Sequence, residues 1–364
     1  MRTQAQKSWA IALALLLATG GAFLALAQQP PPPSEQKQGP IQPRQEKQEE
    51  VPYALRVDVP VVSIDLSVVD PKSGTFISGL KKEHFRVYMD GVEQEVVAFA
   101  PTEAPLTAVL VVEASPYIGY IRYDNLDAAY LFLRQLRKDD WVALVSYDMR
   151  PRIEVDFTRD TNEIINHLRH MQYGGFSEVN VYDAVIDTLD RLKDVEGKKS
   201  IVVIGTGVDT FSKHTWDDAR KAARAAGVPI FTIGMGWPAL LAADRVSGNP
   251  RYGRGTQRAA DELRMRLTLA EAQMRDLSEQ TGGRFWNPRF ITQLPGIYEE
   301  VGTLMRNQYS LAFRPKPFQR DGKFHKIELK LTGPDGTPLK VLDQNRKELK
   351  VEILARKGFY APES

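Results

Sequence analysis

The run Ala108-Val-Leu-Val-Val112, followed directly by Glu113-Ala-Ser115, is the stretch that decides the fold. An uninterrupted apolar run that ends in polar residues is typical of a strand buried on both faces, as a parallel sheet requires. Comparable runs recur at 141–145, 201–204 and 230–233. Helical patterns separate most of them, and helices are expected at 124–137, 161–170, 182–192, 215–226, 257–279 and 292–306. Alternating buried strands and helices predict an α/β fold at 105–308, with a doubly wound, mostly parallel, Rossmann-like sheet.

β-rich segments lie on both sides of this α/β domain. Apolar and polar residues alternate through 53–104, around a turn at Asp90-Gly91, and alternate again through 309–364. A period of two residues is the pattern of strands with one buried face. The α/β domain is therefore predicted to be inserted between an N-terminal β module and a C-terminal β segment that pair with each other in a β-sandwich.

Residues 1–27 have the pattern of a signal peptide, because Arg2 and Lys7 precede an apolar run that ends in small residues. The alternative is an uncleaved anchor in the inner membrane, since the run from Trp9 to Ala27 is nearly long enough to span a bilayer. In either case the rest of the chain is expected outside the cytoplasm, in the periplasm or the extracellular space, with no membrane span left after cleavage. Residues 28–52, rich in Pro, Gln and Glu, are predicted to be a disordered linker.

Charge and cysteine content exclude several classes of function. The chain has 48 Lys and Arg against 46 Asp and Glu, and two of the basic residues lie in the predicted signal peptide. The mature protein is therefore formally neutral, which argues against a nucleic-acid partner. With no cysteine in the sequence, disulfides, zinc–thiolate sites, a cysteine nucleophile and a lipid-modified cysteine are excluded.

Several short motifs follow one another along the chain. They are Tyr182-Asp-Ala184, Ile201-Val-Val-Ile-Gly-Thr-Gly-Val-Asp-Thr210, Thr281-Gly-Gly-Arg-Phe285, Arg306-Asn-Gln-Tyr309 and Arg356-Lys-Gly-Phe-Tyr-Ala-Pro362. With the β module upstream of them, this order resembles the von Willebrand factor type A (VWA)-related proteins of acidobacteria over residues 55–362. The resemblance implies a metal-ion-dependent adhesion site, in which carboxylate and hydroxyl oxygens hold Mg²⁺ and leave one position open for an acidic group of a partner.

The sequence departs from that metal site at most of its positions. The family's first loop is Asp-x-Ser-x-Ser, whereas this chain has Glu113, Ser115 and Tyr117. Thr206 stands where the family has an aspartate, and the loop at 174–181 has no threonine where one belongs. Because octahedral Mg²⁺ tolerates little displacement of its ligands, we expect a degenerate site without bound metal. The alternative is a looser Mg²⁺ cage with ligands from Glu113, Ser115, Glu178 and Asp209.

We therefore expect direct contacts with a protein partner at the strand-end rim rather than contacts through a metal. Ligands of open α/β sheets lie at the carboxyl ends of strands, and exposed aromatic side chains are typical anchors. The predicted partner-binding rim consists of Ser115, Tyr117, Phe176, Ser177, Asn180 and Asp209. The predicted function is adhesion or protein–protein interaction by an exported protein that is not an enzyme.

A serine hydrolase is the rival from another class, with candidate residues Ser115, His214, Asp183 and Asp217. Ser115 is not in a Gly-x-Ser-x-Gly elbow, and no segment marks an oxyanion hole. His167 and His170 lie one turn apart on a predicted helix, and without a third ligand they indicate a solvated face.

The segment 237–257 is rich in arginine and glycine. It is either a loop that binds an acidic partner, through Arg245, Arg251 and Arg254, or a disordered surface excursion. In the helix expected at 257–279, apolar residues at helical spacing predict a core-facing stripe of Leu263, Leu267, Ala270, Met274 and Leu277.

Overall fold

The computed structural model describes residues 61–363 except 103, 120–121, 175–177, 247–248, 250, 252, 334 and 343–347. The predicted signal peptide, the predicted linker and the alternating segment at 55–59 lie outside the described residues. In the part of the chain that is described, no helix is both long and apolar enough to cross a membrane.

The central domain is built on a six-stranded sheet with the order β6-β5-β4-β7-β8-β9. Its strands are β4 (Leu106–Glu113), β5 (Trp141–Tyr147), β6 (Pro151–Thr158), β7 (Lys198–Gly205), β8 (Ile230–Gly234) and β9 (Phe285–Trp286). Neighbouring strands are parallel except for β6, which pairs antiparallel with β5 at the edge. The predicted doubly wound, mostly parallel sheet is confirmed, and the edge strand β6 is an addition that the apolar runs did not reveal.

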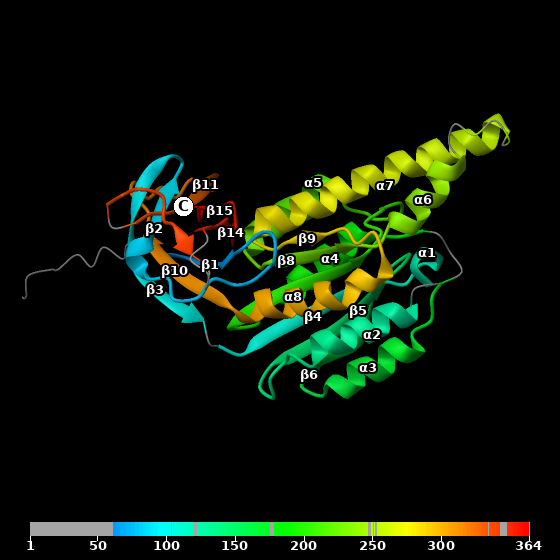
Figure 1. The fold of residues 1–364 in the computed structure, drawn as a ribbon, viewed down its shortest axis with the longest axis horizontal. Coiled ribbons are helices and arrows are strands. Elements are labelled where there is room, and N and C mark those ends of the chain that lie inside the picture. Colours follow the sequence, from blue (N-terminus) through cyan, green and yellow to red (C-terminus); the bar gives the residue numbers. More distant parts are fainter. Residues whose placement is uncertain are drawn as a thin grey trace, which may run out of the picture. The chain divides into compact units, whose positions relative to one another are not determined.

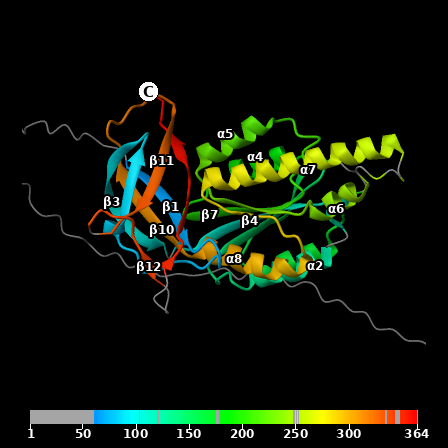
Figure 2. The same cartoon turned by 45° about the horizontal axis from the view of Figure 1, so that its top comes forward.

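Helices cover both faces of this sheet, as Figure 2 shows. One face packs against α1 (Pro116–Gly119), α2 (Arg122–Leu133), α3 (Thr161–His170) and α8 (Leu294–Arg306). The other packs against α4 (Val181–Arg191), α5 (Trp216–Ala226) and α7 (Arg254–Thr281). Both faces of β4 are therefore covered, and all its residues are buried, which explains its uninterrupted apolar sequence.

The segment 237–257 contains more regular structure than the sequence predicted. It forms α6 (Trp237–Val246) and the first turn of α7, and Figure 1 shows α6 lying against the N-terminal part of α7. Pro238 near the start of α6 has the backbone geometry that the first turn of a helix needs, and alanines and leucines follow it. The glycines farther along obscured this short helix, so the reading of the whole segment as irregular was wrong.

Strands from both flanks make up a second sheet with the order β14-β1-β10-β3-β2-β11-β15. They are β1 (Val62–Val69), β2 (Phe85–Met89), β3 (Val92–Thr102), β10 (Gln308–Arg314), β11 (Phe324–Leu331), β14 (Glu352–Ala355) and β15 (Gly358–Tyr360). A separate pair is formed by β12 (Val341–Leu342) and β13 (Glu348–Leu349), and short 3₁₀ turns occur at Lys82–His84 and Ile291–Gln293. All pairs in the seven-stranded sheet are antiparallel, and β10 lies between β1 and β3.

The β-sandwich expected from the two flanks is corrected to one curled sheet. Its end strands β14 and β15 are separated along the chain only by Arg356 and Lys357, so the sheet must bend until its two ends approach each other. The bend encloses an aromatic core. The rings of Phe99 and Tyr309 stack with their centroids 5.0 Å apart, and the ring centroid of Phe85 lies 4.9 Å from that of Phe99. A sandwich would need two sheets, whereas the continuous pairing supplies one.

A buried ion pair lies where the chain passes from the central domain to the second sheet. Arg306, the last residue of α8, binds the carboxylate of Asp140, whose side chain is fully buried. That carboxylate also accepts the Leu106 N–H at 2.8 Å and the Arg137 N–H at 2.6 Å. These contacts hold the amino end of β4 and the end of α8 together.

Candidate functional site

Glu113 occupies the carboxyl end of β4 and is completely buried. Its Oε1 accepts a hydrogen bond from the Ser115 hydroxyl at 2.5 Å. Its Oε2 accepts two more from Thr206, at 2.6 Å from the backbone N–H and at 2.8 Å from the hydroxyl. Since Thr206 follows β7, this carboxylate joins the loops after two neighbouring strands.

The longer side chain of glutamate fits because position 205 is a glycine. A Cβ at Gly205 would overlap the Tyr147 hydroxyl and lie 2.6 Å from Glu113 Oε2. Burial raises the pKa of Glu113, and the hydrogen bonds from Ser115 and Thr206 oppose that rise. Burial, followed by the nearby charge of Glu113, also raises the pKa of Tyr147 well above its ordinary value. The strand end is therefore a sealed polar cluster formed by Glu113, Ser115, Tyr147 and Thr206.

The donor set at this strand end does not fit Mg²⁺. Both oxygens of Glu113 are already occupied by protein donors, and Thr206 provides a neutral group where the metal site requires a carboxylate. Asp209 is engaged elsewhere, accepting the Tyr182 N–H at 3.1 Å and the Ser212 hydroxyl at 2.5 Å. Across the described residues no group of three or more His, Asp or Glu side chains could hold a metal ion. Among the described residues, the acidic candidates Glu113, Glu178 and Asp209 are therefore not found grouped around one position.

Two of the residues predicted to contact a partner are in the interior. Ser115 is 0% exposed and Asn180 is 2% exposed. Ser115 donates to Glu113, and the Asn180 amide donates to the Met149 carbonyl at 3.1 Å, so both polar groups serve the fold. Their placement on a partner-facing rim was wrong, because sequence position alone does not show which way a loop residue points.

The remaining predicted rim residues have different outcomes. Tyr117 belongs to the short helix α1, and Phe176 and Ser177 lie outside the described residues. Asp209 is partly buried and lines a groove of about 280 Å³. Among the predicted rim residues whose side chains the structure describes, Asp209 lines a surface hollow.

The groove beside Asp209 runs between the loop after β7 and the helix α7. Its walls include Val208, Thr210, Arg266 and Leu269. Two further lining residues are hydrogen-bonded, because the Tyr182 hydroxyl donates to the Gln273 side-chain oxygen at 2.9 Å. Next to Thr210 in the chain, Phe211 is 51% exposed. A partner could therefore meet apolar side chains and charges of both signs in one place.

Exposed apolar residues extend this surface along α7. Met265 is 67% exposed and Leu269 is 59% exposed, and both line a second hollow of about 520 Å³. The predicted core stripe of α7 is confirmed for Leu267, Ala270, Met274 and Leu277, with Leu263 partly buried. Met265 and Leu269 lie four residues apart and outside that stripe, and this spacing is the signal that would have identified them from the sequence.

The residues of the hydrolase alternative do not form a catalytic triad. The imidazole of His214 pairs with Asp183 at 2.8 Å, whereas the Ser115 hydroxyl donates to Glu113 and is inaccessible. Asp217 pairs with Arg220 on the surface. Burial alone would raise the pKa of Asp183, but hydrogen bonds from the Lys213 and His214 N–H groups and from the His214 ring lower it.

The two histidines of α3 also have separate partners. His167 contacts Glu154 at 2.7 Å, and the His170 ring contacts the Asn166 carbonyl at 2.8 Å. They are not brought together around a common position.

A comparison with protein-family models agrees with the fold of the central domain. The family profile of the von Willebrand factor type A domain matches residues 109–261. No curated protein sequence matches the chain at a significant level.

Solved structures with detectable similarity to this chain include the following three. BatB from Bacteroides thetaiotaomicron is 15% identical, with 55% of this chain and 98% of that chain covered and a TM-score of 0.39. A von Willebrand factor type A protein from Catenulispora acidiphila is 10% identical, with 76% of this chain and 74% of that chain covered and a TM-score of 0.42. The vWF domain of the type V pili tip protein Mfa5 from Porphyromonas gingivalis is 11% identical, with coverages of 55% and 95% and a TM-score of 0.40.

Proposed function

The chain contains a von Willebrand factor type A domain at 109–261, and we propose that this domain binds a protein partner directly, without Mg²⁺ and without catalysis. The binding surface is the strand-end rim of the central sheet, and the role is adhesion or assembly outside the cytoplasm. The location rests on the basic and apolar pattern of residues 1–27.

The observation that carries this proposal is the contrast between two parts of the rim. At the end of β4 the polar groups are used internally, so little remains there for a partner or a metal. Leu269 lines the neighbouring groove, Met265 lines the adjoining hollow on α7, and Phe211 follows the groove residue Thr210 in the chain. Each of the three exposes half or more of its surface. Large apolar side chains beside a hollow with charged walls are typical of binding surfaces, where a few anchors contribute most of the affinity.

Tyr117, Phe176 and Ser177 stay in the proposal as additional contacts. In the chain, Tyr117 comes shortly after β4, and the segment that contains Phe176 and Ser177 comes between α3 and α4. Asp209 lines the groove itself, so its carboxylate is the proposed polar contact of this surface.

The proposal is tested by cross-linking and recovery of partners from an envelope extract. A Phe211→Ala, Leu269→Ala double variant is expected to lose at least one protein that the wild type recovers, with the loss unchanged by EDTA. Val92→Ala is the matched control, because Val92 is 54% exposed but lies on the second sheet. Equal recovery of every partner by the double variant and the wild type would remove the groove from consideration. Recovery that requires Mg²⁺ would restore the metal-dependent alternative.

A further inference from the structure

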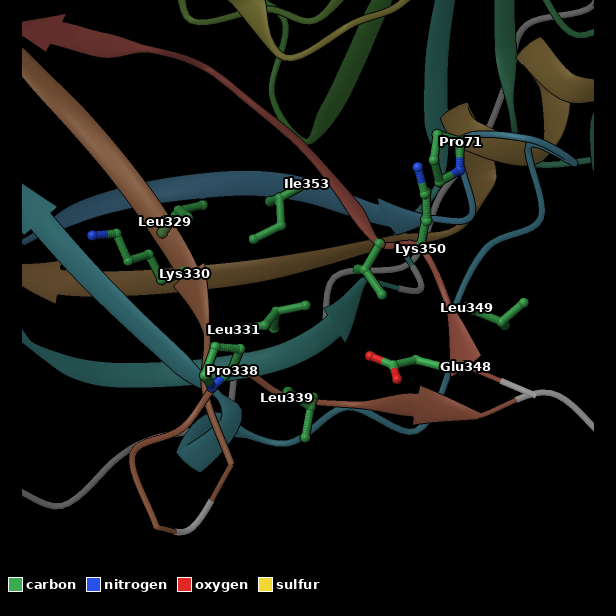
Figure 3. Close-up of a pocket in the computed structure, with 11 residues that line it drawn as sticks. Pro71, Leu329, Lys330, Leu331, Pro338, Leu339, Glu348, Leu349, Lys350 and Ile353 are labelled. Carbon is green, nitrogen blue, oxygen red and sulfur yellow. The ribbon is translucent and has the colours of Figure 1, made fainter. Parts of the chain in front are cut away.

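Another hollow, separate from the two described above, lies in the curled sheet. It has a volume of about 820 Å³ and an apolar lining that includes Leu329, Leu331, Leu339, Leu349, Val351 and Ile353. Figure 3 shows Leu331 and Ile353 directed into the space between their strands. These side chains are only half-buried, although they pack against the core of the sheet. The core is therefore incompletely covered on this side.

The hollow exists because one continuous segment changes its pairing partner. Its first half, β14, pairs with β1, and its second half, β15, pairs with the beginning of β11 at residues 324–326. The end of β11 and the beginning of β14 are thereby left apart. The two ends of the curled sheet meet at β15 but diverge toward Leu331 and Val351.

The edge of β11 that faces the hollow has unused hydrogen-bonding groups. The Ile327 N–H bonds to the Lys357 carbonyl on this side, whereas the Thr332 N–H bonds to His84 on the β2 side. Because successive residues of a strand point their N–H and C=O groups to opposite edges, Leu329 directs both groups toward the hollow. Within the described part of the chain these two groups have no partner, and the next carbonyl on this edge, that of Leu331, is bonded to Leu339.

The edge of β14 that faces the hollow also has backbone groups without a strand partner among the described residues. The Val68 carbonyl of β1 accepts the Ile77 N–H, so Val68 faces away from β14 and its neighbours Ser67 and Val69 face toward it. Their partners Leu354 and Glu352 then point toward β1, and the backbone groups of Ile353 point outward. No backbone partner for Ile353 on that outer side occurs among the described residues.

We propose that this hollow, named here the β11–β14 wedge, binds an extended segment of a partner protein as an added strand. The segment pairs with the backbone of Leu329 and places alternate apolar side chains against Leu331, Val351 and Ile353. Strand addition to an open edge takes affinity from backbone hydrogen bonds and specificity from such side-chain pockets.

The charges at the rim of the wedge specify one further feature of the segment. The ammonium nitrogen of Lys330 lies 3.3 Å from a carboxylate oxygen of Glu328, and that of Lys340 lies 4.0 Å from a carboxylate oxygen of Glu348. Lys350 is exposed and forms no ion pair within the described residues. An acidic residue at the end of the segment beside Lys350 therefore completes the match.

The experiment uses the full mature chain and a synthetic peptide with the sequence Ac-Val-Thr-Val-Thr-Val-Glu-NH₂. Backbone amide exchange of the protein is followed by NMR with and without the peptide. The amides of Leu329 and Ile353 are expected to exchange roughly tenfold more slowly when the peptide is bound, because hydrogen bonding protects them. A peptide N-methylated at its central residues keeps the side chains but loses backbone donors, and is expected to bind about tenfold more weakly.

Two protein variants complete the design. Leu349→Glu puts a charge into the lining and is expected to abolish peptide binding, and Ile353→Ala is expected to weaken it if the first variant fails to fold. Leu342→Ala is the matched control, since Leu342 is 55% exposed on β12 and does not line the wedge. Absence of peptide binding, equal binding of the N-methylated peptide, or binding of palmitate in place of the peptide would each overturn strand addition. None of these outcomes bears on partner recovery through the groove beside Asp209.

Discussion

Two buried carboxylates lie at opposite ends of β4 and behave in opposite ways. Asp140 caps the amino end through the Leu106 N–H, and Glu113 ends the strand at the rim. Both side chains are shielded from solvent and both accept backbone N–H groups. Asp140 also has the guanidinium of Arg306, whereas Glu113 has only hydroxyl and amide donors.

The difference shows how the neighbours of a buried carboxylate decide its contribution to stability. Burial alone would raise the pKa of Asp140, but the bonds from Arg306, Leu106 and Arg137 outweigh it and the pKa lies below its ordinary value. For Glu113 burial dominates, and the pKa lies above its ordinary value. Asp140 therefore stabilises the fold most above the acid range, while an ionised Glu113 reduces stability as the pH rises.

The largest effect is expected from Asp140→Asn, which breaks the ion pair and leaves Arg306 without its counter-charge. We expect the free energy of unfolding to fall by about 3 kcal/mol at neutral pH. A lowered pKa means that wild-type stability is lost as the pH falls toward and through the pKa of folded Asp140, so the variant and the wild type should converge in acid. Urea unfolding between roughly pH 3 and 8 measures both effects. Asp139→Asn is the control, because Asp139 is the exposed neighbour, and a similar loss there would refute the role of the pair.

Gly205→Ala tests the close packing that seals the other end of the strand. The added Cβ would overlap the Tyr147 hydroxyl and crowd Glu113, so we expect a loss of about 2 kcal/mol in the free energy of unfolding. Tyr147→Phe removes the nearest atom and should recover part of the loss in the double variant. A double-mutant cycle by thermal unfolding measures this coupling. Simple additivity would show that the clash with Tyr147 is not the cause.

Glu113→Gln keeps the size of the side chain but replaces one acceptor with a donor that faces Thr206 or Ser115. A cost of about 1.5 kcal/mol is expected near pH 5, where a carboxyl with a raised pKa is less charged than at neutral pH. Because the pKa of Glu113 is raised, wild-type stability declines as the pH rises above the ordinary glutamate pKa of 4.5, so the difference should shrink toward pH 8. Glu299→Gln, at an exposed site on α8, should change stability by less than about 0.5 kcal/mol. A difference that grows with pH would contradict the raised pKa.

The sequence predicted the elements better than the contacts between them. Buried runs marked β4, β7 and β8, and Thr215 and Gly227 mark the ends of α5 as an N-terminal cap and a left-handed C-terminal residue. The bond between Glu113 and Thr206 joins residues 93 positions apart, and no local pattern encodes it. The resemblance to a metal site pointed to the loops after β4 and β7, but the direction of each side chain depends on how the two loops meet.

The curled sheet shows a different limit of sequence patterns. Alternation identified most of its strands but not their order, which depends on long-range pairing between β1, β10 and β3. The change of partner between β14 and β15 takes place within Arg356 and Lys357, too short a segment to leave a periodic signal. The wedge beside Leu329 follows from that change and could not be inferred from composition.

The smallest effect on thermal stability is expected from adding Mg²⁺ to the wild type. This experiment tests whether the carboxylate of Glu113 is held by protein donors alone. If hydroxyl donors have replaced the metal at Glu113, adding Mg²⁺ should leave the midpoint of thermal unfolding unchanged, because a ligand stabilises only a state that binds it. The triple variant Glu113→Asp, Tyr117→Ser, Thr206→Asp supplies the carboxylates and hydroxyls that the metal site requires. A restored site with a Kd of about 1 mM would gain roughly 1.4 kcal/mol at about 10 mM Mg²⁺. Stabilisation of the wild type by that amount would show that Glu113 exchanges its protein donors for a cation and that the strand end is not sealed.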